Sequence, residues 1–299
     1  MLRNYLAPNL RKILEHLDFS EVEEVRLRLN RPLMIKNRLG CYSLSPLGAY
    51  CSCSEAYLVS REDLDRTLQL ITQSSWYAWE QQIQGGYLTL PGGHRVGLSG
   101  QAVFANGSLK TIKNISSLNF RQAKAVIGAA DSLVNQVISQ RTLGVISTLI
   151  VSPPGCGKTT LLRDLARQVA NGGFQVTVID ERSEIAASYL GVPQLDVGFQ
   201  TDVLDGYDKV TGVYHALRGL APDVVFTDEI GHEQDAWILG ELARSGVKVV
   251  ATCHGNSLEQ IKTKTWAKIS LEVFELMVIL SRRRGPGTVE AVLSLRAKS

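Results

Sequence analysis

The sequence predicts an α/β fold in two domains: a smaller N-terminal α+β domain over residues 1–130 and a doubly wound α/β domain over residues 131–299. The first observation is length, because 299 residues correspond to about two domains of ordinary size. The second is a change of pattern near residue 131. There, short strands with turn signals give way to helical segments that alternate with apolar, β-branched runs. Such runs are typical of parallel strands covered by helices on both faces.

The N-terminal domain opens with segments of contrasting periodicity. Leucine and isoleucine recur at helical spacing over residues 2–17, which predicts an amphipathic packing helix. Residues 23–35 alternate apolar with polar side chains and predict a half-buried strand. A second helix is expected over residues 61–84, because Ser60 can cap it and Asp63 stands three residues later.

Glycine and proline divide the last part of this domain into strands. The segment "GGYLTLPGGHRVGLSGQAVFANGSL", residues 85–109, contains turn signals at Pro91-Gly92-Gly93 and at Asn106-Gly107. Strand-forming residues flank both signals. We therefore expect strand, turn, strand and turn in succession.

The composition is that of an ordinary globular protein, with 44% hydrophobic and 20% charged residues. A net charge of +3 is too small to indicate a nucleic-acid or membrane partner. The five cysteines form no C-x-x-C pair, which favours reduced thiols and argues against a disulfide framework or a zinc site. No run approaches the roughly 18 apolar residues of a membrane span. We therefore expect a cytoplasmic protein that reaches a membrane through partners.

A phosphate-binding loop is the most informative motif of the C-terminal domain. The segment "VSPPGCGKTT", residues 151–160, follows an apolar run, precedes a helical pattern and fits G-x-x-x-x-G-K-[ST], except that Ser152 replaces the first glycine. We expect the loop to bind phosphate despite this serine, which removes only the left-handed backbone conformation that glycine would permit there.

The loop predicts ATP and Mg²⁺ as ligands. Proline has no N–H, so the phosphate donors are the amides from Gly155 to Thr160, at the N-terminus of the following helix. Lys158 would contact the β- and γ-phosphates, and the Thr159 hydroxyl would help to hold Mg²⁺. The predicted cofactor-binding residues are Pro154, Gly155, Cys156, Gly157, Lys158, Thr159 and Thr160.

Acidic and polar residues end three other predicted strands. In "APDVVFTDEIG", Asp228 is predicted on the metal side and Glu229 as the residue that orients or deprotonates the attacking water. Ligands bind at the carboxyl ends of strands in such sheets, so the other polar strand ends are also candidates. These are Asp180, Glu181 and Glu184 in "VTVIDERSEI", and Thr252 and His254 in "VKVVATCH", which could sense the γ-phosphate.

The order of these motifs resembles that of the ATPases of type II and type IV secretion systems. Four segments, "SPPGCGKTTLLRDLAR", "VIDERSEIA", "GGHRVGLSGQAV" and "SRRRGPGTVE", resemble the stage III sporulation protein AA family, and the resemblance covers nearly the whole chain. It implies a RecA-like P-loop ATPase domain behind the smaller N-terminal domain, a ring of six subunits and acceptance of Ser152. It also implies a role in the mother cell, at a membrane channel complex facing the forespore, with the cytosolic parts of channel proteins as partners.

Two other functions fit parts of the sequence. A nucleic-acid-binding P-loop ATPase could use "SRRRGPG", residues 281–287, as a basic contact, although an exposed turn between two strands is the simpler interpretation. A nucleotide-gated scaffold would bind ATP and scarcely hydrolyse it, but Glu229 argues against that function.

The sequence also raises the question of a catalytic arginine, because γ-phosphate hydrolysis is often accelerated by an arginine from outside the loop. The ATPase domain is short of arginines near the expected strand ends, whereas the N-terminal domain offers Arg95 and Arg121. Arg121 matches the place where secretion ATPases carry such arginines. Our hypothesis is that it reaches the γ-phosphate when the N-terminal domain closes over an ATPase domain. The predicted catalytic residues are Glu229, Lys158, Arg121, Arg95, Glu181 and His254.

Overall fold

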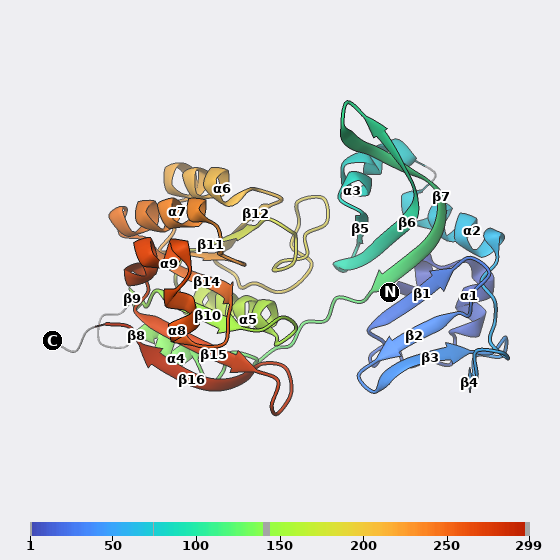
Figure 1. Cartoon of the computed structure of the whole chain (residues 1–299), viewed down its shortest axis with the longest axis horizontal. Helices are drawn as coiled ribbons and strands as arrows, with labels where there is room; N and C mark the ends of the chain where they lie inside the picture. The colour runs from blue at the N-terminus through green and yellow to red at the C-terminus, as the bar shows by residue number, and fades with distance from the viewer. Residues whose placement is uncertain (1, 74, 140–143, 297–299) are drawn as a thin grey trace. The chain divides into compact units, whose positions relative to one another are not determined.

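The computed structural model describes the chain except for residues 1, 74, 140–143 and 297–299. It divides into two compact units, an N-terminal unit of Met1–Lys124 and a C-terminal unit of Ala125–Ser299. Figure 1 labels the elements of each unit.

In the described part of the N-terminal unit, seven strands form an antiparallel sheet in the order β4-β3-β2-β1-β7-β6-β5. The strands are β1 (Glu24–Arg28), β2 (Met34–Asn37), β3 (Gly40–Leu44), β4 (Tyr50–Cys51), β5 (Tyr87–Leu90), β6 (His94–Ala105) and β7 (Ser108–Arg121). The helices are α1 (Pro8–Ile13), α2 (Arg61–Thr72) and α3 (Glu80–Gln84), with 3-10 turns at Leu2–Tyr5 and Trp76–Trp79.

The predicted helices of this unit are shorter in the structure than in the sequence pattern. Pro8 confines Ala7 to an extended conformation with ψ of 148°, so residues 2–17 form a 3-10 turn followed by α1. The capping box of Ser60 and Asp63 is confirmed at the start of α2. A single helix over residues 61–84 is wrong, because Gln73 adopts φ of 49° and ends α2 after Thr72.

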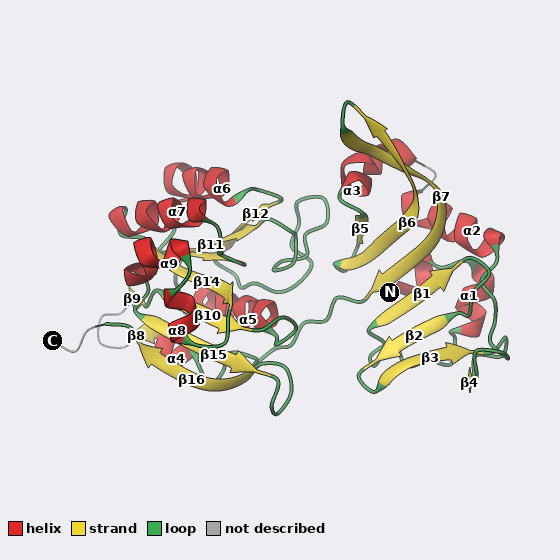
Figure 2. Ribbon diagram, viewed as in Figure 1, coloured by secondary structure: helices red, strands yellow, loops and turns green. Residues whose placement is uncertain are grey.

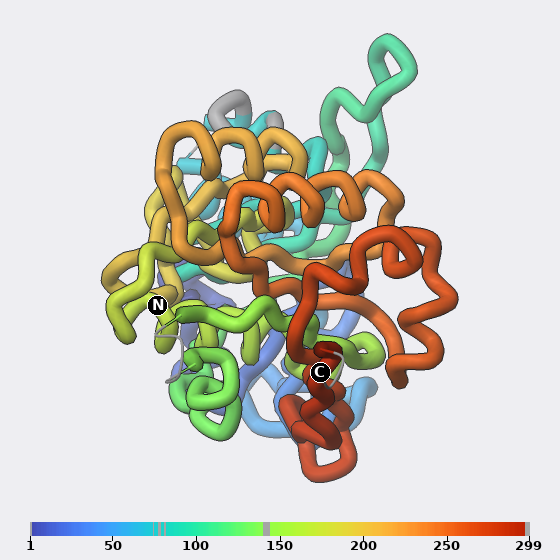
Figure 3. The backbone as a smooth tube through the Cα atoms, turned by 90° about the vertical axis from the view of Figure 1, so that its left-hand side faces the viewer, coloured from blue at the N-terminus to red at the C-terminus, as the bar shows by residue number. Residues whose placement is uncertain are grey.

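The turns of this unit lie where glycine was expected to place them. Gly92 and Gly93 have φ of 86° and 74° between β5 and β6, and Asn106 and Gly107 have φ of 51° and 78° between β6 and β7. Ala105 pairs with Ser108 across the second turn. The β6–β7 hairpin extends from its unit as a twisted arm (Figure 3).

In the described part of the C-terminal unit, seven strands form a sheet in the order β12-β11-β13-β14-β10-β15-β16, in which only β16 runs antiparallel to its neighbour. The strands are β10 (Thr148–Ser152), β11 (Val176–Asp180), β12 (Thr201–Asp205), β13 (Val224–Thr227), β14 (Lys248–His254), β15 (Leu276–Ser281) and β16 (Thr288–Ser294). A small ribbon pairs β8 (Ile138–Ser139) with β9 (Gly144–Val145).

Helices cover both faces of this sheet (Figure 2). They are α4 (Val134–Val137), α5 (Lys158–Asn171), α6 (Lys209–His215), α7 (Glu233–Arg244), α8 (Leu258–Lys262) and α9 (Thr265–Ser270). Ile150 of β10 packs in one core with α5, whereas its neighbours Leu149 and Val151 pack in a second core with α7. The strands β10, β11, β13 and β14 are therefore buried on both faces, as their unbroken apolar sequences predicted.

The strand order determines which loops meet at the edge of the sheet. β14 lies between β10 and β13, and β11 follows β13, all running parallel. The loops after β10, β11, β13 and β14 therefore lie along one edge. The predicted turn of residues 281–287 joins β15 to β16, which confirms the simpler interpretation of its sequence. Among the described residues, no helix has both the length and the apolar character needed to cross a bilayer.

Candidate nucleotide-binding site

The loop between β10 and α5 has the backbone of an anion-binding site. Gly155 and Gly157 adopt φ of 70° and 86°, which favour glycine because a side chain would be strained there. Gly157 is the N-cap of α5, and no side chain of the described residues caps the helix. The amide groups of the first turn are therefore available to an anion, and the helix dipole would favour negative charge at the same point.

Ser152 fits its position without backbone strain. It is the last residue of β10, is fully buried and pairs in register with His254. It is not among the described residues with positive φ, so the left-handed conformation expected to burden it does not occur. Its hydroxyl donates to the Pro153 carbonyl at 2.8 Å, and its oxygen lies 3.3 Å from the Lys158 ammonium.

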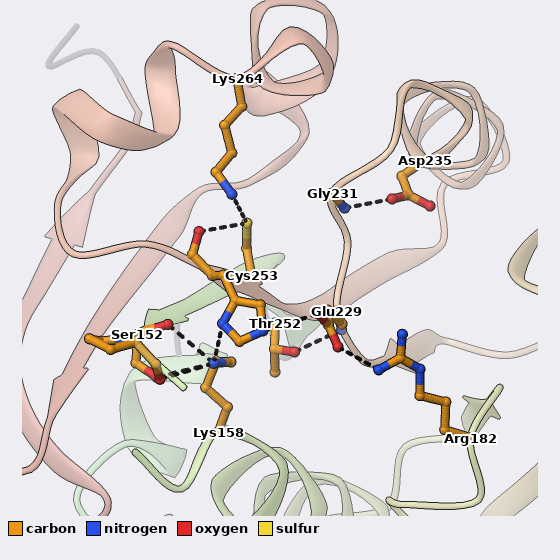
Figure 4. Close-up of polar contacts among 11 residues, drawn as sticks. Ser152, Lys158, Arg182, Glu229, Gly231, Asp235, Thr252, Cys253 and Lys264 are labelled. Carbon is orange, nitrogen blue, oxygen red and sulfur yellow. Dashed lines mark hydrogen bonds and ion pairs between the residues drawn. The ribbon is translucent and has the colours of Figure 1, made fainter. Parts of the chain in front are cut away.

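Lys158 is only 9% exposed and points back across the loop (Figure 4). Its Nζ lies 3.1 Å from the carbonyl oxygen of Ser152, 3.2 Å from that of Pro153 and 3.1 Å from Nδ1 of His254. Burial lowers the pKa of Lys158, and the negative charge of Glu229 opposes that shift. The lysine is thus held at the loop by acceptors with which a phosphate oxygen would compete.

His254 connects Lys158 to Glu229. Its Nδ1 faces Lys158, and its Nε2 lies 3.0 Å from Oε1 of Glu229. If Nδ1 accepts from the lysine, the ring proton is on Nε2 and is donated to the carboxylate, so a neutral imidazole satisfies both contacts. The structure therefore brings together three of the predicted catalytic residues in one hydrogen-bonded chain.

The backbone and side chain of Glu229 are held from several directions. Its N–H donates to Oγ1 of Thr252 at 2.8 Å, and its Oε2 accepts from Arg182 at 3.1 Å (Figure 4). Glu229 has φ of 36°, an uncommon value for a residue with a side chain. On the far side of the loop, Asp235 accepts from the amides of Gly231 and His232 at 2.6 and 2.8 Å and caps α7. The hydroxyl oxygen of Thr252 thus holds the loop that carries Glu229.

Asp180, which ends β11, holds the loop that follows it. It is fully buried and accepts hydrogen bonds from the amides of Glu184, Ile185 and Ala186 at 2.7 to 2.9 Å. From the other side, buried Arg163 of α5 donates to the carbonyls of Glu184 and Ile185. A carboxylate and a guanidinium therefore clamp this loop by its backbone.

Asp228 is also buried, but its hydrogen bonding differs from that of Asp180. It is 5% exposed, and within the described part of the chain its carboxylate has no hydrogen-bond donor. Burial raises its pKa to about 7, and repulsion by Asp180 adds to the shift. An oxygen donor whose charge is disfavoured in this way fits a divalent cation. Among the described residues no three His, Cys, Asp or Glu side chains group to hold a metal, so Mg²⁺ would also need phosphate, hydroxyl or water oxygens.

A cavity of about 450 Å³ lies beside these strand ends. Its lining includes Glu181, Arg182, Asp208, Lys209, Asp228, Glu229, His254 and Lys264. His254 and Glu229 belong both to this lining and to the chain that starts at Lys158. The polar cavity thus adjoins the phosphate-binding loop.

Two cations at this edge were missed by the sequence reasoning. Predicted Glu181 pairs with Lys209 at 2.5 Å, whereas Glu229 is paired with Arg182. The expectation that this unit is short of arginines near the strand ends is therefore wrong. The signal was present, because Arg182 directly follows Glu181 in "VIDERSEI".

Arg95 and Arg121 lie in the N-terminal unit, directly opposite each other on β6 and β7. The Arg95 guanidinium stacks on the ring of Tyr87, with 4.6 Å between its central carbon and the ring centroid. Arg121 also stands opposite Glu24 on β1. Both belong to a different unit from the phosphate-binding loop.

Comparison with known proteins agrees with this architecture. The family model for sporulation stage III, protein AA matches residues 1–299. Stage III sporulation protein AA of Bacillus subtilis (strain 168) is 37% identical over 279 residues, which cover 91% of this chain and 86% of that protein. The type IV pilus assembly ATPase TfpB of Acinetobacter baylyi is 27% identical over 129 residues, 43% of this chain and 20% of that protein.

Two solved structures show the same fold at low identity. The Legionella pneumophila ATPase DotB has a TM-score of 0.57 at 14% identity, over 89% of this chain and 74% of that one. The pilus retraction motor PilT with bound ADP has a TM-score of 0.56 at 15% identity, over 93% of this chain and 80% of that one. These similarities confirm the predicted RecA-like α/β fold class.

Proposed function

The chain belongs to the stage III sporulation protein AA family, and on this premise we propose that it hydrolyses ATP to drive assembly of, or transport through, a membrane-associated channel complex in sporulation. Its fold is that of secretion and pilus ATPases. The observation that carries the proposal is the series of side-chain contacts from Lys158 through His254 to Glu229. It joins the residue that would bind the phosphates to the carboxylate that would act on water.

Each residue then has a separate task. The loop amides and Lys158 bind the β- and γ-phosphates, because no described side chain caps the first turn of α5 and the lysine offers a buried positive charge. Glu229 orients the attacking water or takes its proton. His254 touches both groups and would report the presence of the γ-phosphate to Glu229.

Thr159 and Asp228 would hold Mg²⁺, which would neutralise charge on the phosphate oxygens when it is bound. Asp228 is suited to this task because its buried carboxylate has no donor within the described part of the chain. Arg121, and with it Arg95, would supply positive charge to the γ-phosphate when the N-terminal unit closes over an ATPase unit. The ATPase unit would belong either to the same chain or to a neighbouring subunit in a ring of six subunits.

In this proposal the protein works in the cytoplasm of the mother cell and is recruited to the membrane by the cytosolic parts of channel proteins. The test is steady-state phosphate release from ATP over a range of protein concentrations, with and without those cytosolic segments. We expect turnover per chain to rise with concentration as a ring assembles, and to rise further with the correct segment. The Lys158→Ala variant is the inactive control. The absence of turnover from the wild-type chain under all these conditions would exclude the ATPase.

A further inference from the structure

The loop between β15 and β16 contacts the phosphate-binding loop within the C-terminal unit. The N–H of Gly287 donates to the carbonyl oxygen of Cys156 at 2.8 Å. The approach is close, because a Cβ added to Gly157 would lie only 3.0 Å from the nitrogen of Gly287. Sequence segments far apart in the chain therefore share one backbone interface at the nucleotide site.

The three arginines of this loop have different surroundings. Arg283 forms an ion pair with Glu290 at 3.2 Å. Arg284 is exposed, and its backbone N–H donates to Oγ1 of Thr288. The Arg282 guanidinium is next to Gly155, since a Cβ added there would lie 3.6 Å from Nη1. Within the described part of the chain, the Arg282 side chain has neither an ion pair nor a hydrogen bond.

We propose that Arg282 binds the phosphate chain of the nucleotide held by its own subunit. The inference rests on the proposed ATP site and adds to it a binding residue in cis. An anion bound by the loop amides would lie on the backbone that Arg282 already approaches, and no described carboxylate competes for the guanidinium. Guanidinium groups match phosphate geometry with paired N–H donors.

The different environments of the three arginines argue against a general basic patch for nucleic acid. Glu290 offsets the charge of Arg283, so the loop does not present three free cations. The contacts of Gly287 and Arg282 are directed at the phosphate-binding loop. A nucleotide phosphate is therefore the ligand that this geometry favours.

The test is equilibrium binding of ATP, ADP and adenosine to the full chain, with variants Arg282→Ala, Arg282→Lys and Arg284→Ala. We expect Arg282→Ala to weaken ATP and ADP binding by about 10- to 100-fold, as for loss of a hydrogen bond to a charged group. Arg282→Lys should lose less, and adenosine binding should not change. Arg284→Ala is the matched control from the same loop and should bind ATP like the wild type. Thermal unfolding should be the same for all four chains.

Two results would overturn the inference. One is unchanged ATP affinity in Arg282→Ala; if this variant also abolished salt-sensitive binding of a single-stranded oligonucleotide, Arg282 would belong to a nucleic-acid contact. The other is an equal loss of ATP affinity in Arg284→Ala, which would make the effect one of general positive charge. If the wild-type chain binds no ATP, the proposed function and this inference both fail. If the wild-type chain binds ATP and the Arg282 variants bind it with the same affinity, only this inference fails.

Discussion

Asp63 in the N-terminal unit and Asp228 in the C-terminal unit are buried to the same extent, at 4% and 5% exposure, but they have different surroundings. Asp63 accepts hydrogen bonds from the hydroxyl of Tyr57 at 2.6 Å, and from the amide and hydroxyl of Ser60 at 2.9 Å each. Asp228 has no donor among the described residues, and its pKa is raised to about 7. A carboxylate whose hydrogen bonds are satisfied holds a helix terminus in place, whereas one left without donors remains available to a ligand.

The same contrast extends to the two sheets. The described strands of the N-terminal unit run antiparallel to their neighbours, and the buried Asp63 of this unit caps α2. In the C-terminal unit, parallel strands bring Asp180, Asp228 and His254 to one edge, where Lys158 also lies. We therefore expect the buried polar groups of the first unit to stabilise the fold and those of the second unit to bind the nucleotide.

Arg121 is the proposed exception to this division, because it belongs to the N-terminal unit. Arg121→Ala should lower ATP turnover by a factor on the order of 10³ with little change in ATP affinity, as for other arginines that stabilise the transferring phosphate. Phosphate release and equilibrium ATP binding, measured at concentrations where the protein assembles, check this. Turnover at the wild-type rate would make Arg121 structural and would exclude closure of the N-terminal unit as the source of the catalytic arginine.

The pair Asp228→Asn and Asp63→Asn tests the comparison directly. Asp228→Asn should weaken Mg²⁺-dependent ATP binding by about 10- to 100-fold, the usual cost of altering a group that supports a metal. Its free energy of unfolding should not fall, because burial already disfavours the carboxylate charge. Asp63→Asn should lower the free energy of unfolding by about 1–3 kcal/mol and leave ATP affinity unchanged. Exchanged phenotypes, in which Asp63→Asn impairs nucleotide binding and Asp228→Asn unfolds the chain, would break the division.

His94 in the N-terminal unit should have a smaller, pH-dependent effect on the free energy of unfolding. Burial lowers its pKa below the ordinary value of 6.5, and its Nδ1 accepts from the amide of Ala123 at 3.2 Å. The folded chain therefore favours the neutral ring. Its contribution to stability is complete above about pH 6.5 and is lost as the pH falls through the lower, folded-state pKa.

Denaturant unfolding at pH 7 and pH 5 measures this contribution. His94→Gln should lose less stability between the two pH values than the wild type does. His16→Gln changes an exposed histidine of the same unit and serves as the control, with the wild-type difference expected. An equal pH difference in the His94 variant and the wild type would contradict the assignment.

Local rules predicted much of the fold. The phosphate-binding loop, the capping box and the Asn106-Gly107 turn each depend on a few neighbouring residues, so the sequence alone was sufficient to find them. The end of α2 was not predictable in the same way, because Gln73 adopts a left-handed conformation without a glycine or proline signal. Pro8 did carry a signal, and the broken first helix follows from its known effect on the preceding residue.

The contacts between side chains in the candidate site were harder to predict from the sequence. Strand ends predicted that Lys158, Glu229 and His254 would lie near one another. They did not predict that Arg182 would pair with Glu229 and Lys209 with Glu181, because those contacts depend on loop paths and rotamers. The approach of Arg282 to Gly155 depends likewise on the path of the β15–β16 loop.

The Glu229→Gln variant separates hydrolysis from binding, because Glu229 is proposed to act on the attacking water whereas Lys158 is proposed to bind the phosphates. The measurement is ATP affinity together with single-turnover hydrolysis by the full chain, with Lys158→Ala alongside. We expect near wild-type ATP affinity with strongly reduced hydrolysis for Glu229→Gln, and loss of ATP binding for Lys158→Ala. Wild-type hydrolysis by Glu229→Gln would contradict the catalytic assignment, and unchanged ATP affinity in Lys158→Ala would contradict the site itself.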